Sequence, residues 1–93
     1  MQDGRFERDD AKADANRHKH GVQFEIARHV FDDPNGFDET DNGPDELRWK
    51  RVGQTSRGML AVIYTERAPR TRIIAARRAT RHEQGDYHRQ AFP

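Results

Sequence analysis

The side chains best suited to chemistry in this chain are arginines and one glutamate that gather in its last third. The segment Tyr64–Arg67 contains Glu66 and Arg67, and the segment Arg70–Arg78 contains four more arginines. The planar fork of an arginine binds phosphate oxygens in pairs, and a carboxylate can accept a proton. These two segments therefore offer phosphate binding and general acid–base chemistry.

Whether these side chains meet on one surface depends on how two neighbouring strands alternate. Successive side chains of a strand point to opposite faces, so Glu66 and Arg67 are expected on different faces. On the next strand, Arg72 and Arg77 also fall on different faces if that strand is unbent. A bulge or a strand end must bring all four together, or only some of them take part.

The net charge of +1 conceals a strong separation of charge along the chain. Residues 1–46 hold six Lys/Arg and thirteen Asp/Glu, a net −7, whereas residues 47–93 hold eleven and three, a net +8. A basic second half predicts a surface for polyanions. Docking of one half on the other would explain the same separation, and charge runs are usually solvated. Both interpretations stay open at this point.

Composition limits both the fold and the chemistry. Ninety-three residues form one domain, and with 32% hydrophobic and 35% charged residues the core must be concentrated in a few segments. The absence of cysteine excludes a disulfide scaffold, a thiolate metal site and a thiol nucleophile. We expect no metal site, because His18 and His20 diverge on a helix and no third ligand is evident. No apolar run suits a membrane span or a secretory signal, so a cytoplasmic protein is expected.

Local patterns predict one α+β domain over residues 1–93, with its core at about 5–90. Asp9 is a suitable N-cap, Gly21 can end a helix, and Thr80 with Glu83 fits a capping box. The acidic stretch 36–45 predicts a loop or a poor edge strand. The strands are expected to form an antiparallel meander with helices on one face and the other face open. In chain order we expect a weak strand at 5–8, helices at 11–19 and 23–31, strands at 47–52, 59–65 and 70–76, and a helix from residue 80.

An ordered set of short motifs over about residues 5–89 resembles the BrnT family of bacterial toxins, which are built on a RelE-like ribonuclease fold. The set as a whole is specific, although no single motif is diagnostic. The family's tight Gly-Asp turn is replaced here by Ala68 and Pro69, so a longer or reshaped loop is expected there. The motifs are Asp9, Lys12, Asn16, Lys19-His20-Gly21-Val22, Phe24-Glu25, Ala27, Val30-Phe31, Asp33-Pro34, Glu46, Arg48, Tyr64-Thr65-Glu66-Arg67, Arg72-Ile73-Ile74, Ala76-Arg77, Ala79-Thr80-Arg81, Glu83 and Tyr87.

The resemblance implies an endoribonuclease toxin that cleaves RNA and inhibits translation. The 2′-OH of RNA can attack its own phosphate in line, and such a reaction needs no metal or cofactor if the protein supplies the charges. By resemblance the catalytic residues are Glu66, Arg67, Arg72 and Arg77, with Arg72 and Arg77 on the phosphate and Glu66 as base or as orienter of an arginine. An ion-pair role for Glu66 that only holds arginines in place is the alternative.

Six further residues are expected to bind RNA. Those on the first helix could bind phosphate or donate a proton, although a solvated helix end explains them equally well. The others lie in or near the predicted strands and at the start of the last helix, where they could steer RNA. The six are Lys12, Lys19, His20, Arg48, Tyr64 and Arg81.

The resemblance also implies a partner, a cognate BrnA-like antitoxin that forms a hetero-oligomer with the chain. An acidic antitoxin segment would lie on the basic sheet surface and mask it, and operator DNA would be bound only through the antitoxin. A different class remains open, namely a non-catalytic module that binds nucleic acid or a partner by charge. A third interpretation, a poison of DNA gyrase, rests only on relatives of the fold, and fold does not determine function.

Overall fold

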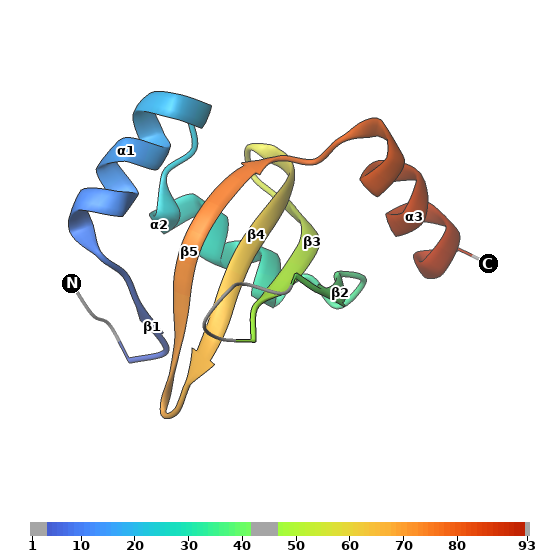
Figure 1. Ribbon diagram of the computed structural model, residues 1–93. Helices are drawn as coiled ribbons and strands as arrows, with labels where there is room; N and C mark the ends of the chain where they lie inside the picture. Colours follow the sequence, from blue (N-terminus) through green and yellow to red (C-terminus); the bar gives the residue numbers. More distant parts are fainter. Residues whose placement is uncertain (1–3, 42–46, 93) are drawn as a thin grey trace.

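The computed structural model describes residues 4–41 and 47–92. Within these residues the chain forms a five-stranded sheet, three helices and one 3-10 segment, as Figure 1 shows. The predicted α+β fold class is confirmed. In chain order the elements are β1 (Phe6–Glu7), α1 (Asp10–His20), α2 (Phe24–Ala27), η1 (Arg28–Asp32), β2 (Phe37–Thr40), β3 (Trp49–Thr55), β4 (Gly58–Arg67), β5 (Arg70–Arg78) and α3 (Arg81–Ala91).

The sheet has the strand order β1-β5-β4-β3-β2. Strands β2 to β5 form the expected antiparallel meander, and β2 is an edge strand in the acidic stretch where a loop or poor strand was predicted. The weak first strand differs from the expectation because it pairs parallel with β5, Phe6 opposite Thr71 and Glu7 opposite Arg72. Helix α1 follows β1 after two residues, and this short strand is an added edge of the sheet.

Helices cover both faces of the sheet, and the expectation of helices on one face only is wrong. One face, called here the helix face, packs Leu60, Val62 and Ile73 against residues of α2 and η1 such as Phe24 and Val30. On the opposite face, Val52 and Ala61 pack with Tyr87 of α3. In Figure 1, α1 lies along β5 and α3 stands at the far edge beyond β3. The apolar positions of α3 are too few to show from sequence which face it covers.

Local signals explain where α1 begins and ends. Asp9 accepts a hydrogen bond from the Lys12 backbone N–H, and Gly21 ends the helix in the left-handed conformation with φ of 71°. The buried Asn16 then ties α1 to the outer edge of β5. Its amide donates to the Ala76 carbonyl (2.8 Å) and accepts from the Ala76 N–H (3.0 Å), so it replaces a neighbouring strand at that point.

One local expectation is wrong, and another is met in one of its two alternatives. The predicted helix over 23–31 is split into the short α2 and the 3-10 segment η1. The connection at Ala68 and Pro69 is reshaped, as one of the two alternatives expected, but it is not longer, because Arg67 still pairs with Arg70 and only two residues join the strands. The Ala68–Pro69 peptide bond is cis, and neither residue has the positive φ that a type I′ turn requires.

Candidate functional site

A β-bulge brings the predicted arginines to one face of the sheet. In β4 and β5, Ile63 pairs with Ala75 but the next residue, Tyr64, pairs with Ile73, so β5 has one extra residue between them. Directly opposite residues share a face. Arg72 is therefore on the same face as Thr65, and Arg77 on the same face as Ala61, away from α1 and α2.

This surface is called here the arginine face. Arg67 and Arg70 pair directly with each other near the turn and fall on it as well. From sequence, a bulge or a strand end was needed to bring these arginines to one face, and the structure contains the bulge. Three of the four expected catalytic residues thus share a face, namely Arg67, Arg72 and Arg77.

The short strand β1 places a carboxylate beside Arg72. Glu7 lies opposite Arg72 in the parallel pairing, and its Oε2 accepts a hydrogen bond of 3.2 Å from Arg72 Nη1. The side chains are 15% and 23% exposed, so the pair is largely shielded from water. Close by, the backbone N–H of Lys12 and the positive charges of Lys12 and Arg72 lower the pKa of Asp9. Lys12 itself is exposed on the first turn of α1.

A second carboxylate, Glu83 of α3, holds Arg77. Glu83 accepts two hydrogen bonds from Arg77, at 2.7 and 3.0 Å, and its Oε2 lies 2.8 Å from Lys50 Nζ. The Thr80 backbone N–H donates to it as well, completing the predicted capping box. Burial alone would raise the pKa of Glu83, but the bonds from Arg77, Lys50 and Thr80 outweigh it and hold that pKa well below its usual range. In return, Glu83 raises the pKa of Arg77.

Glu66 and Tyr64 lie on the other side of the sheet from the arginines. Glu66 accepts hydrogen bonds from the Thr71 hydroxyl at 3.2 and 3.3 Å, and it is exposed near the turn. Tyr64 is buried against Phe31, with ring centroids 4.9 Å apart, and its hydroxyl donates to Asp38 Oδ1 at 2.6 Å. Burial and this bond raise the pKa of Tyr64. The structure therefore brings neither residue together with the arginines.

The remaining expected RNA-binding residues are dispersed. Lys19 and His20 are exposed at the C-terminal end of α1, seven and eight residues from Lys12, or roughly 10–12 Å along a helix. Arg81 is exposed on the first turn of α3. Arg48 is half-buried just before β3, and its Nε is buried without a hydrogen-bond partner among residues 4–41 and 47–92.

Sequence reasoning missed three members of this site, Glu7, Lys50 and Glu83. Glu83 was identified only as a helix cap, because a capping carboxylate and an arginine partner look alike in sequence. The place of Glu7 depends on the parallel pairing of a two-residue strand, for which no sequence signal exists. Lys50 could have been found, since it follows Arg48 at strand spacing and so shares its face.

The described part of the chain contains neither a candidate metal site nor a candidate membrane-spanning helix. No group of three or more His, Cys, Asp or Glu residues there is arranged to hold a metal ion. No helix among the same residues has the length and apolar character needed to cross a membrane.

Together these features define a small α+β protein with a sheet face of carboxylate-held arginines, a surface suited to phosphate-bearing ligands. Comparison with protein families agrees with this class. The family model described as ribonuclease toxin, BrnT, of type II toxin–antitoxin system matches residues 9–83, and the chain belongs to this family. The resemblance inferred from the motifs is thus confirmed. A search of the curated proteins finds no match.

Proposed function

We propose that this ribonuclease toxin is a metal-independent endoribonuclease whose reaction takes place on the arginine face. The observation that carries the proposal is the bulge in β5, which gives Arg72 and Arg77 a common face. A ribonuclease of this kind turns the RNA 2′-OH into the nucleophile, so the protein must orient one phosphate and neutralise the charge that develops on it. Arginines fixed by carboxylates are suited to that task.

Arg72 and Arg77 are the proposed phosphate ligands. Each guanidinium has five N–H donors in a rigid fork. Glu7 occupies Nη1 of Arg72, while Glu83 occupies both terminal nitrogens of Arg77 on one side. Donors on both guanidiniums are therefore left for phosphate oxygens, more of them on Arg72. With its side chain 36% exposed, Arg77 is also accessible to a ligand.

The carboxylate that accepts the 2′ proton is assigned to Glu7 in preference to Glu66. Glu7 is 3.2 Å from Arg72, on the face where the phosphate would be held. A general base must come within hydrogen-bond reach of the proton it removes, directly or through one water. Glu66 is on the opposite face and could reach the phosphate only around the exposed end of β4, beside Arg67.

As a type II toxin, the protein has a cognate antitoxin partner. We infer that this partner is BrnA-like, that it forms a hetero-oligomer with the toxin in the cytoplasm, and that operator DNA is bound only through it. An acidic antitoxin segment over the arginine face would compete with RNA for the same guanidiniums. Release of the toxin would then expose the face and stop translation through RNA cleavage.

The test is incubation of purified protein with defined single-stranded RNA in EDTA. Wild type and Glu66→Gln should give discrete cuts, whereas Arg72→Ala, Arg77→Ala and Glu7→Gln should not. If Glu66→Gln is inactive and Glu7→Gln active, the carboxylate assignment is reversed while the mechanism stands. Cutting that disappears in EDTA and returns with added Mg²⁺ would overturn metal independence.

A second function is favoured by one feature of the site. Because Arg72 and Arg77 are already paired with carboxylates, the face could serve to bind RNA or a partner without cleaving it. In that case no RNA would be cut. Binding would fall gradually with each basic residue removed and with rising salt.

A further inference from the structure

A second basic region lies at the far end of the sheet, outside the site described above. It is a hollow of about 390 Å³ between the ends of α1 and α2, the turn from β3 to β4 and the last residue of β5. Three arginines line it, Arg17, Arg57 and Arg78, around an apolar floor of Val22, Ile26 and Leu60. We call it the end hollow. Because Arg78 pairs with Leu60, the end hollow is on the helix face.

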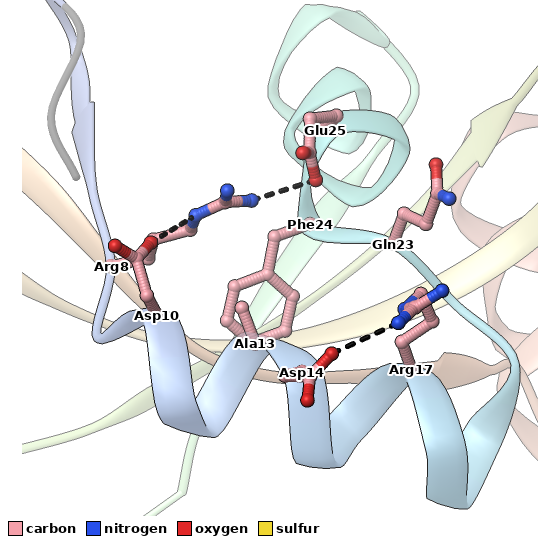
Figure 2. Close-up of a pocket in the computed structure, with 8 residues that line it drawn as sticks. All are labelled: Arg8, Asp10, Ala13, Asp14, Arg17, Gln23, Phe24 and Glu25. Carbon is pink, nitrogen blue, oxygen red and sulfur yellow. Dashed lines mark hydrogen bonds and ion pairs between the residues drawn. The ribbon is translucent and has the colours of Figure 1, made fainter.

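Nearby carboxylates neutralise the arginines of the end hollow less than those of the arginine face. Arg17 is paired with Asp14 at 2.9 Å. Around Arg57 and Arg78, by contrast, residues 4–41 and 47–92 place no carboxylate within ion-pair distance. A neighbouring hollow between α1 and α2 shows the opposite case, because Arg8 is bonded to both Asp10 and Glu25 there, as Figure 2 shows.

Arg78 is held in place by the backbone of the turn that carries Arg57. In the turn before β4, the Thr55 hydroxyl donates to the Gly58 carbonyl (2.8 Å) and accepts from the Arg57 N–H (3.1 Å). Gly58 has a φ of 101°, which side chains rarely allow, so this turn has a defined shape. Arg78 then donates through Nη1 to the Arg57 carbonyl at 3.2 Å. Arg78 is therefore fixed beside Arg57 at the rim of the hollow through a backbone carbonyl and not through a carboxylate.

The end hollow and the arginine face are linked at the end of β5 by two neighbouring residues. Arg77 and Arg78 are consecutive residues on opposite faces of that strand, since Arg77 pairs with Ala61 and Arg78 with Leu60. A single strand of RNA with one phosphate at Arg77 can pass over the strand end and place a neighbouring phosphate at Arg78. Gln23, which also lines the end hollow and lies near Arg17 in Figure 2, adds an amide that can donate and accept hydrogen bonds.

We propose that the end hollow is a second RNA subsite, which binds one nucleotide outside the cleaved bond; this rests on the proposed ribonuclease function. Arg57 and Arg78 take its phosphate, and its base lies against Val22 and Ile26 with an edge toward the Gln23 amide. Bases are commonly held by stacking, by arginine planes and by hydrogen bonds to their edges. The floor is mostly buried, with Leu60 only 1% exposed. It suits one planar base better than a protein segment, whose docking requires a larger apolar core.

The test separates binding from cleavage by using 2′-O-methyl RNA, which the 2′-OH mechanism cannot cut. Affinities of wild type and the double variant Arg57→Ala/Arg78→Ala are measured by fluorescence anisotropy, for dinucleotides and for oligonucleotides of about ten nucleotides. We expect the double variant to bind the longer RNA roughly tenfold more weakly, with a salt slope lower by about two. Dinucleotide binding, and the cleavage rate of bound RNA at saturation, should not change.

One control variant and one further test variant make the outcome decisive. Arg89→Ala removes an exposed arginine of α3 that is paired with Asp86, and it should leave both RNAs bound as in wild type. Gln23→Ala should weaken binding of the longer RNA by a smaller factor, and this factor should depend on which base occupies the end hollow. Equal binding of the longer RNA by wild type and a folded double variant would overturn the subsite. So would loss of antitoxin binding in that variant with RNA binding intact. No cleavage of unmodified RNA by wild type would instead count against the proposed function.

Discussion

The arginine face and the end hollow use the same side chain in two different ways. On the arginine face, Arg72 is bonded to Glu7 and Arg77 to Glu83, so each guanidinium has a carboxylate partner. In the end hollow, Arg78 is held by the backbone carbonyl of Arg57. A carboxylate fixes a guanidinium firmly but cancels its charge, whereas a carbonyl positions it and leaves the charge to a ligand. The two regions therefore suit different tasks.

A fixed position of the hydrogen-bond donors matters most for the reaction rate, because charge develops in the transition state. A donor that is already fixed needs no rearrangement in the transition state, and this advantage exceeds the loss of ground-state attraction. Affinity, by contrast, depends on net charge and on the counterions released when phosphates are bound. We therefore expect changes on the arginine face to alter the cleavage rate, and changes in the end hollow to alter RNA affinity.

The largest effect is expected for Arg72→Ala. Removal of one preorganised donor of this kind lowers a catalytic rate by roughly 10²- to 10³-fold. Single-turnover cleavage at saturating RNA measures this rate apart from binding. Arg81→Ala, which removes an exposed arginine at the start of α3, is the matched control and should change the rate by less than about twofold. A rate for Arg72→Ala within twofold of wild type would mean that Arg72 takes no part in the chemical step.

The next largest effect is expected for Glu83→Gln, measured as the free energy of unfolding in urea. Glu83 is 4% exposed and satisfies both Arg77 and Lys50. Removal of one charge from a buried network leaves its partners uncompensated and costs roughly 3 kcal/mol. The arginine face should lose its geometry while the end hollow keeps its affinity for phosphate. A variant as stable as wild type would show that α3 is held by Tyr87 and Val52 alone.

Protonation of Glu83 at low pH should destabilise the protein in the same way as Glu83→Gln. The pKa of Glu83 is lowered in the folded protein, so the unfolded chain binds its proton more tightly. The stabilisation is fully present above the ordinary pKa of 4.5 and is lost as the pH falls below it. Unfolding measured between about pH 7 and pH 3 should therefore show a steeper acid loss in wild type than in Glu83→Gln. Parallel curves would contradict the assignment.

A smaller effect, shared by both regions, is expected for Asn16→Ala. Asn16 satisfies the N–H and the carbonyl of Ala76, just before Arg77 and Arg78 leave the strand on opposite faces. Leaving buried backbone groups unsatisfied costs about 2 kcal/mol. Both the cleavage rate and the affinity for long RNA should fall, together with the thermal midpoint. Ala15→Gln, on an exposed part of the same helix, is the control and should change none of the three.

Sequence patterns predicted the parts of this molecule that depend on short-range chemistry. The cap at Asp9, the helix end at Gly21 and the capping box at Thr80 each involve residues within one helical turn, and all three are present. The common face of Arg72 and Arg77 was not predictable in detail, because the position of a bulge depends on how two strands settle in register. Family motifs identified the arginines but not Glu7, whose role depends on a long-range strand pairing.

The smallest effect is expected for Tyr64→Phe, which tests the boundary between the two faces. The motif around Glu66 suggested an RNA-binding tyrosine, but the hydroxyl is bonded to Asp38 beneath η1. Its loss should cost about 1 kcal/mol of stability, since Asp38 keeps its ion pair with Arg51. Cleavage rate and RNA affinity should stay within twofold of wild type. A clear fall in either quantity, in a variant that is fully folded, would mean that RNA reaches the helix face near Glu66. Glu66 would then again be a candidate for the catalytic carboxylate.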